Sequence, residues 1–255
     1  MELSDWTQIH TYILHLEQEG LVTRTFRRLD PERQQMILDA ILDEAVEKGP
    51  TALNIKQVAE RAGVSVGSLY TYFPNREGML AFAIQVCVRI VTDAFDEFRP
   101  LLLAMPLREA LAAYLVGGIE WSRMYTGLLR LFARAAYHGD PELADTLVRP
   151  IATVLRELVR DMLIQAGERG EIRQDVDLEA TARLVHALTI AADDSQLLPY
   201  LNTYFQVVNE RVAPERMVEA LISLVLHGIG TEETGENDPS RFSQEGQNDD
   251  MEDTR

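Results

Sequence analysis

Residues 54–76 hold the clearest structural signal of the chain, in the sequence NIKQVAERAGVSVGSLYTYFPNR. Four apolar side chains recur there at the spacing of one helix face, at Ile55, Val58, Ala59 and Ala62. Asn54 suits the N-cap of this helix, and Gly63 suits the left-handed residue that ends it. Ser65 can cap a second helix, which Pro74 stops. The stretch therefore predicts a helix, a tight turn and a second helix.

The second helix of this unit has residues suited to the major groove of DNA. In a helix-turn-helix, the N-terminal part of the second helix faces base edges, and small residues such as Gly67 let the backbone approach. Hydroxyls and cations contact phosphates, and the unit offers Ser65, Ser68, Tyr70, Tyr72, Lys56 and Arg76. The candidates for contacting bases are Lys56, Val66, Gly67 and Thr71. The unit is therefore a candidate DNA-binding surface.

Spacing alone leaves a second interpretation open, because two short helices joined by a glycine turn can also simply pack a core. The residues from Ala59 to Glu77 favour DNA binding, since AERAGVSVGSLYTYFPNRE closely resembles the signature of the tetracycline-repressor (TetR) family of transcriptional regulators. The resemblance extends from about Pro31 through Leu80. It implies a dimeric, all-helical repressor with a three-helix DNA-binding head and a helical ligand-binding body.

The resemblance also implies roles for individual residues. The family's phosphate contacts fall on Asn54, Ser65, Tyr70, Tyr72 and Arg76. Its base-reading positions fall on Lys56, Val66, Gly67 and Thr71, and Ser68 could serve either purpose. Val66 departs from the polar or basic residue of many members, which weakens the case for hydrogen-bonded readout at that position.

Charge is unevenly distributed along the 255 residues, whose net charge is −17. This total argues against a general nucleic-acid binder, so DNA binding would depend on a local surface and on salt. Residues 231–255 hold nine acidic residues and two arginines, whereas residues 21–33 hold four arginines and two acids. Composition is otherwise that of a soluble globular protein, and no leader or long uncharged apolar run is visible. We expect a cytoplasmic protein with no membrane contact.

Residues 1–29 form an extension ahead of the resembling region. Their apolar spacing predicts a short amphipathic helix that Gly20 ends, with Leu3, Trp6, Ile9, Ile13 and Leu16 on its apolar face. One interpretation is a helix packed on the body or on a partner subunit. The other is an arm that reaches DNA through Arg24, Arg27 and Arg28.

The rest of the chain predicts an all-α fold, with no alternating strand segment. The three-helix head covers residues 30–80 and begins with the helix start at Asp30-Pro31. A long helix from Asn75 to about Phe98 links it to a helical ligand-binding and dimerisation body at 81–229, where Pro150 should break or kink a helix. Residues 230–255 should be a disordered acidic tail.

Two apolar segments of the body are candidates for a dimer interface. Residues 178–192 are apolar almost all round, and Pro214 to Ile229 carries a broad apolar stripe. Together they could build the four-helix interface that the resemblance implies. The alternative is a closing helix of a monomeric core. A two-fold dimer would present its heads to the half-sites of a palindromic operator, about 34 to 36 Å apart.

An aromatic cluster at the centre of the body is the candidate effector pocket. Its residues are Trp121, Met124, Tyr125, Phe132, Tyr137 and His138. The alternative is that these side chains are ordinary core. The resemblance implies a small, often apolar effector whose binding changes the spacing of the heads and releases the operator.

Two other classes of protein compete with a regulator. An enzyme lacks support, because the five histidines show no paired metal-ligand spacing and no nucleophile elbow, phosphate loop or dinucleotide motif appears. We therefore expect no catalytic residue, metal or cofactor. A helical protein-interaction module with a purely structural helix-turn-helix is the remaining alternative. Its outer helix face would not need the phosphate-binding residue types found at Ser65, Tyr70, Tyr72 and Arg76.

Overall fold

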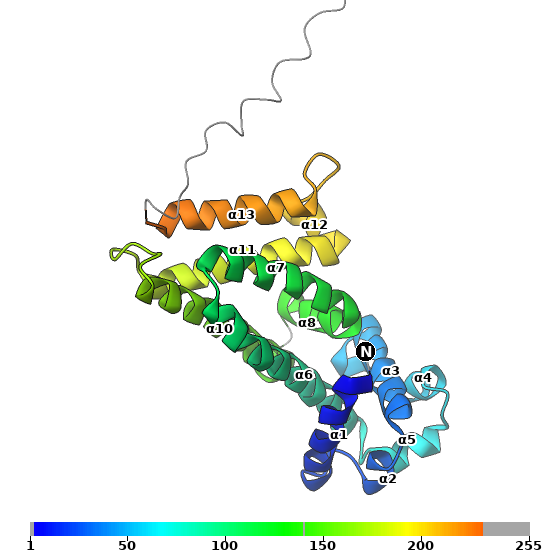
Figure 1. Cartoon of the computed structure of the whole chain (residues 1–255). Coiled ribbons are helices and arrows are strands. Elements are labelled where there is room, and N and C mark those ends of the chain that lie inside the picture. The colour runs from blue at the N-terminus through cyan, green and yellow to red at the C-terminus, as the bar shows by residue number, and fades with distance from the viewer. Residues whose placement is uncertain (1–2, 140, 232–255) are drawn as a thin grey trace, which may run out of the picture.

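The computed structural model describes residues 3–139 and 141–231, and this part of the chain is helical without a strand. Figure 1 shows α1 to α5 gathered at one end, α6 running away from them, and α7, α10, α11 and α13 around the far half of α6. The helices are α1 (Leu3–Gln18), α2 (Arg24–Arg27), α3 (Pro31–Lys48), α4 (Ile55–Arg61), α5 (Val66–Tyr72), α6 (Arg76–Ala104), α7 (Leu107–Met124), α8 (Thr126–His138), α9 (Pro141–Leu143), α10 (Arg149–Glu168), α11 (Leu178–Leu197), α12 (Pro199–Phe205) and α13 (Pro214–Ile229). A 3₁₀ turn, η1 (Pro50–Ala52), follows α3, and a π-helical turn, η2 (Ala144–Val148), precedes α10. The proposed acidic tail lies outside the described residues from position 232 onward.

Local capping fixes where the head helices begin. Asp30 accepts a hydrogen bond from the backbone N–H of Arg33 at 2.9 Å and so caps α3. Asn54, Ser65 and Asn75 cap α4, α5 and α6 in the same way. The turn after α4 contains Gly63 at φ 62°, a conformation that a side chain would strain. The helix, turn and helix expected from residues 54–76 are therefore confirmed.

The N-terminal extension packs inside the head. Ile9, Ile13 and Leu16 of α1 are buried in the same core as α3, α5 and the first half of α6. Its apolar face closes the core formed by α3 and α6, and Tyr12 donates a hydrogen bond of 3.1 Å to Gln85 of α6. The helix therefore contacts the first residues of the expected body as well as the head, and its packing on a partner subunit stays a prediction. Residues 24–27 are likewise a short helix rather than an extended arm.

The long connecting helix α6 joins two hydrophobic cores. Its first half, from Met79 to Val91, lies in the core of the head, which continues into α8, and Leu102 near its end lies in the core of the body. The helix runs six residues beyond the expected end at Phe98 and contains Pro100. Burial of Leu102 and an ion pair between Arg99 and Asp161 of α10 hold this last stretch helical.

A second connection between head and body runs through α3 and α8. The Arg134 guanidinium on α8 donates a hydrogen bond of 3.1 Å to the carbonyl of Val46 on α3. Gly127 also lies at this contact, where a Cβ would make an ordinary van der Waals contact of 3.7 Å with Leu42. The head is thus anchored to the body at two places, one on α6 and one on α8.

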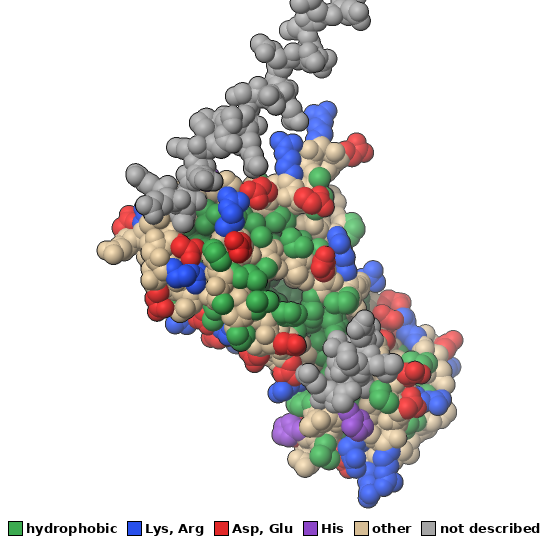
Figure 2. All heavy atoms as spheres, viewed as in Figure 1, with side chains coloured by type: hydrophobic (Ala, Val, Ile, Leu, Met, Phe, Trp, Pro, Cys, Tyr) green, Lys and Arg blue, Asp and Glu red, His purple; other side chains and the backbone are tan. Residues whose placement is uncertain are grey.

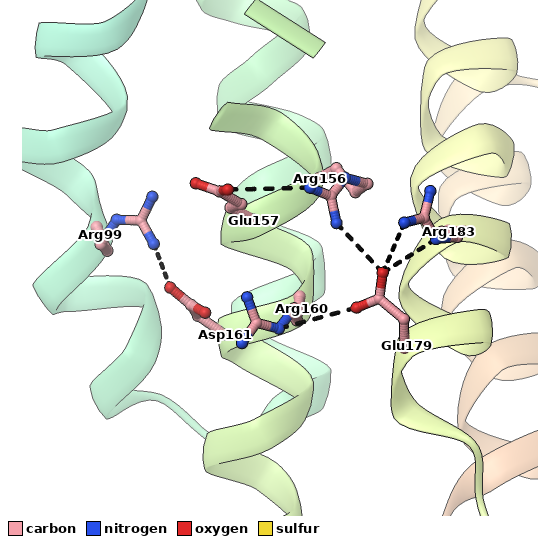
Figure 3. A network of polar contacts seen from close by, with 7 residues as sticks. All are labelled: Arg99, Arg156, Glu157, Arg160, Asp161, Glu179 and Arg183. Atoms are coloured by element: carbon pink, nitrogen blue, oxygen red, sulfur yellow. Dashed lines mark hydrogen bonds and ion pairs between the residues drawn. The ribbon is translucent and has the colours of Figure 1, made fainter. Parts of the chain in front are cut away.

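The expected irregularity at Pro150 takes the form of the π-helical turn just before it. Proline lacks the N–H that would bond four residues back, and its ring crowds that carbonyl, so a wider turn accommodates it. Farther along, charged side chains of α6, α10 and α11 form the network in Figure 3, in which Glu179 accepts from Arg156 and Arg183. The network lies at the surface between these helices.

One described helix has the length and hydropathy of a membrane span, and it is α6. Within its apolar window, 56% is buried inside the protein, as in the core helix of a folded domain.

Candidate DNA-binding face and ligand pocket

Helix α5 turns one face into the head and the other outward. Leu69 is buried at 1% exposure, and Phe73 just after the helix is buried at 2%. On the outer side Gly67 and Thr71 are exposed, and Tyr70 is 57% exposed. The α5 positions expected to contact DNA are therefore accessible, apart from Ser68 and Tyr72, which are half-buried.

The first turn of α5 is organised by two serine hydroxyls. The Ser65 hydroxyl oxygen accepts from the backbone N–H of Ser68 at 2.9 Å and lies 2.8 Å from the Ser68 hydroxyl oxygen. A Cβ on Gly67 would meet only this Ser65 oxygen, at 3.6 Å. Nothing inside the protein requires glycine at position 67, so its small size matters on the outer side, where DNA would approach.

The hydroxyl proton of Thr71 is already used within α5. The hydroxyl donates to the carbonyl oxygen of Ser68 at 2.6 Å and also lies 3.2 Å from that of Gly67. The γ-methyl group can contact the methyl group of thymine in the major groove, and the hydroxyl oxygen can still accept a hydrogen bond from a base.

The residues flanking α5 take different positions. Asn54 accepts from the backbone N–H of Lys56 at 3.0 Å, and the Lys56 side chain is exposed without an ion-pair partner among the described residues. Arg76 is the first residue of α6, half-buried, with its guanidinium 3.5 Å from Glu77. Tyr72 is partly covered, because its ring packs against Phe26 with a centroid distance of 6.0 Å.

The C-terminal end of α5 has a partner that sequence reasoning missed. Thr23 donates through its hydroxyl to the carbonyl of Thr71 at 2.6 Å and through its backbone N–H to the carbonyl of Tyr72 at 2.9 Å. The contact joins positions 48 residues apart or more, so no local sequence pattern signals it.

The body contains an apolar cavity of about 370 Å³ between α6 and α7. Figure 2 shows the broad hydrophobic surface over these helices. The cavity is lined by Ala94, Phe95, Phe98, Leu101, Leu102, Ala113, Tyr114, Gly117, Gly118, Glu120, Trp121 and Met124. Adjacent glycines at 117 and 118 leave room that side chains would fill, and this pair was the available sequence signal.

A smaller cavity of about 80 Å³ shares the wall of the first and reaches two aspartates of α11. The Oδ1 atom of Asp193 is buried and has no hydrogen-bond partner among the described residues. Burial, together with the neighbouring Asp194, raises the pKa of Asp193 to about 8. This carboxyl is therefore mainly protonated at neutral pH and can donate a hydrogen bond into the cavity.

Asp194 is in a different situation, because it already has a donor. The Tyr137 hydroxyl donates to its Oδ2 atom at 2.7 Å. Burial raises the pKa of Asp194, and the hydrogen bond from Tyr137 lowers it. Both aspartates lie within α11, whose last residue is Leu197.

The structure brings together only part of the expected pocket. Trp121 and Met124 line the larger cavity, and Trp121 and Phe132 line the smaller one. The Tyr125 ring lies 4.4 Å from that of Trp121 but faces a separate space against α3. Tyr137 and His138 are exposed, and neither lines these two cavities. The α6 wall, which includes Phe95 and Phe98, was not among the pocket residues expected from the sequence.

Metal coordination finds no support in the part of the chain that the structure describes. No group of three or more histidine, cysteine or acidic side chains there could hold a metal ion. The thiol of Cys87 is buried, and burial raises its pKa to about 12, so it is inert at neutral pH.

Known proteins resemble the chain in both the head and the body. The model for "Bacterial regulatory proteins, tetR family" matches residues 37–82. The HTH-type transcriptional repressor KstR of Rhodococcus jostii (strain RHA1) is 47% identical over 179 residues, covering 60% of this chain and 82% of that protein. The chain belongs to the TetR family. KstR of Mycobacterium tuberculosis is 30% identical over 145 residues, covering 56% of this chain and 62% of its own length.

Solved TetR-like structures share the fold. A γ-butyrolactone receptor matches with a TM-score of 0.56 and 20% identity over 80% of this chain and 92% of its own. The fatty acid degradation regulator FadR of Bacillus halodurans matches with a TM-score of 0.58 and 18% identity, covering 76% and 98%. This TetR-family chain is thus an all-helical, DNA-binding transcriptional regulator, and its relatives are regulators and not enzymes.

Proposed function

We propose that the chain is a cytoplasmic repressor that binds a palindromic operator as a homodimer and is released by a small, mainly apolar effector. The observation that carries the proposal is the outward face of α5, where small, hydroxyl and aromatic residues are exposed on a helix that the head core holds in place. A helix presented in this way fits the major groove. The relatives named as repressors support the same direction of regulation.

The proposed DNA contacts divide into two sets. Phosphates would be bound by hydroxyl, amide and guanidinium groups, at Asn54, Ser65, Ser68, Tyr70, Tyr72 and Arg76. Bases would be read by Lys56, Val66, Gly67 and Thr71. Val66 is 37% exposed and can offer a base only apolar contact. The Thr71 hydroxyl already donates within α5. Lys56 is therefore the residue of this set whose hydrogen-bonding side chain is not already bonded within its own helix.

The dimer would form through α11 and α13. These helices pack against each other, and three leucines project from them into solvent, with Leu184 at 66%, Leu188 at 44% and Leu224 at 64% exposure. Large apolar side chains on neighbouring helices indicate a protein interface. Replacing Leu184 and Leu224 together with glutamate should give monomers in sedimentation experiments and weaken operator binding, since each monomer holds only one half-site.

The effector would occupy the cavity between α6 and α7. The larger cavity is almost wholly apolar. In the smaller cavity next to it, Asp193 supplies a hydrogen-bonding group. The chemistry fits an apolar molecule with one hydrogen-bond acceptor, such as a carbonyl or hydroxyl oxygen, that reaches the protonated carboxyl. Nile red, an apolar dye with a carbonyl, is a suitable first probe. Gly118→Leu should abolish its fluorescence gain, whereas Gly118→Ala should retain it, because a Cβ there lies 3.6 Å from Asp193.

Helix α6 would transmit effector binding to the head. It carries Phe95 and Phe98 in the cavity wall and Arg76 at its first turn. Position 76 and position 95 are roughly 28 Å apart at 1.5 Å per residue. A small tilt of this helix at the cavity would therefore move the DNA-binding end, and a preference of a few kcal/mol between two tilts is enough to change operator occupancy.

The test is selection of bound duplexes from random DNA, followed by anisotropy titration of the selected sequence at several salt concentrations. We expect a palindromic site whose affinity falls steeply with salt. Failure to enrich any sequence, with or without cell extract as a source of effector, would contradict the proposal. It would favour a helical interaction module instead.

A further inference from the structure

The short helix α2 is fixed to the end of the recognition helix α5. The last carbonyls of a helix have no donor within the helix. Thr23 supplies two donors to the end of α5, at 2.6 Å to Thr71 and 2.9 Å to Tyr72. Because both bonds reach backbone atoms of residues in the proposed DNA-binding face, α2 keeps a set position relative to that face.

The buried ring of Phe26 fixes the orientation of α2. Phe26 is fully buried, and its ring centroid lies 5.1 Å from that of Phe73 and 4.9 Å from that of Phe82. Tyr72 covers it at 6.0 Å. With Phe26 inserted between α5 and α6, the opposite side of α2 must face away from the head.

Two exposed arginines, Arg24 and Arg28, occupy that outer side. The backbone N–H of Arg28 bonds to the carbonyl of Arg24 at 3.2 Å, so the two residues lie one helical turn apart on the same side. Both side chains are exposed, and neither has an ion-pair partner among the described residues. Arg27, between them, is half-buried and ion-paired with Glu17 of α1.

The charge here is opposite to that of the whole chain, which is −17. Figure 2 shows Lys and Arg side chains at the extreme end of the head, where Figure 1 places α2. The neighbouring Asp30 is occupied as the cap of α3. Two uncompensated cations beside a helix that enters DNA match the phosphate backbone flanking the bases that this helix reads.

We propose that Arg24 and Arg28 bind DNA phosphates and extend the operator contact beyond the helix-turn-helix. This inference rests on the proposed DNA binding. It differs from an arm in the minor groove, because Arg24 begins the helix packed on the end of α5 and Arg28 is the C-cap residue of that helix. Phosphate contacts carry no sequence information, so the contribution should be the same for the operator and for unrelated duplexes.

The experiment compares Arg24→Gln/Arg28→Gln with the native protein, by anisotropy on the selected operator and on a scrambled duplex, from low to moderate salt. Each lost phosphate contact should lower the slope of log affinity against log salt by about 0.9. The change should be about 1.8 for the two arginines of one protomer and about 3.6 for the four arginines of the proposed dimer. Affinity should fall by the same factor for both duplexes. Arg108→Gln/Arg149→Gln is the matched control, because it removes two exposed arginines of the body and leaves the same net charge.

The variant Arg24→Lys/Arg28→Lys distinguishes a lost phosphate contact from a structural effect of replacing the arginines, because it keeps both positive charges. Lysine binds phosphate as a point charge, so the salt slope should return close to native. A native slope in the glutamine variant, or an equal drop in the body control, would overturn the proposal. A lysine variant as weak as the glutamine variant would do the same. If the native protein binds neither duplex, the proposed function itself fails, and that result is distinct from the others.

Discussion

The head and the body of this regulator differ in the polar groups beside their candidate functional sites. The buried Glu44 carboxylate of the head lies 3.4 Å from the Arg61 guanidinium, although neither of its oxygens has a hydrogen bond among the described residues. In the head, the polar groups at the helix ends are satisfied, as shown by the capping bonds of Ser65 and Asn75 and by Thr23 at the end of α5. In the body, the Asp193 Oδ1 atom is buried without a hydrogen-bond partner among the described residues, and Asp193 lines the smaller cavity. A surface that recognises a rigid duplex benefits from satisfied, fixed groups. An interior that accepts a ligand benefits from an empty cavity and from a polar group that is still free to form a hydrogen bond.

The largest expected effect on stability comes from removing one aromatic side chain from the head and, for comparison, one from the body. Phe26→Ala empties a fully packed cluster in the head and should lower the free energy of unfolding by about 3–5 kcal/mol. Trp121→Ala should cost less, because Trp121 is half-buried and already borders a cavity. Urea unfolding followed by circular dichroism measures both. Equal losses would show that the body is packed as tightly as the head.

The buried carboxyl of Asp193 in the body should make the stability of the protein depend on pH. Asp193 has a folded pKa of about 8 against an ordinary value of 3.8, so the folded state binds more protons than the unfolded state between these pH values. Stability should therefore fall as pH rises through this window, by up to about 1.4 kcal/mol per pH unit. Asp193→Asn should flatten the profile in urea unfolding between pH 5 and 8. A variant with the native slope would exclude Asp193 as its source.

A hydroxyl deletion on the DNA-binding face tests the head without touching its core. Tyr70→Phe should weaken operator binding up to about tenfold per protomer, the value of one hydrogen bond of about 0.5–1.5 kcal/mol, or up to about a hundredfold for the proposed dimer. Unfolding should be unchanged. Tyr204→Phe on α12 is the matched control, since Tyr204 is 79% exposed and lies on the body. Anisotropy titration on the selected operator gives both affinities. Native affinity in Tyr70→Phe would remove this residue from the set of phosphate contacts.

The smallest effect should come from the surface network of Figure 3. Glu179→Gln removes ion pairs with Arg156 and Arg183, but all three side chains are solvent-accessible. Exposed pairs of this kind contribute about 0–1 kcal/mol. The thermal midpoint should change by only a few degrees, and adding salt should reduce the difference. A large loss would show that the network is a main attachment between α10 and α11.

The same contrast explains what could be predicted from the sequence. The starts of α3, α4 and α5 were predictable, because a cap such as Asp30 or Ser65 acts within three or four residues. The packing of α1 was not, because it depends on which distant core its apolar face closes. The cavity wall at Phe95 was also missed, since an apolar helix residue looks the same whether it faces another side chain or empty space.

The bond between Thr23 and the end of α5 also changes what counts as the smallest DNA-binding unit of this chain. The family pattern begins at residue 37, which suggests cutting the chain just ahead of α3 to obtain an isolated reader. Such a fragment would lose both donors of Thr23 and the ring of Phe26. Its recognition helix would fray at the end nearest the flanking phosphates. In this protein, residues upstream of the shared pattern are part of the folded head that carries the candidate DNA-binding face.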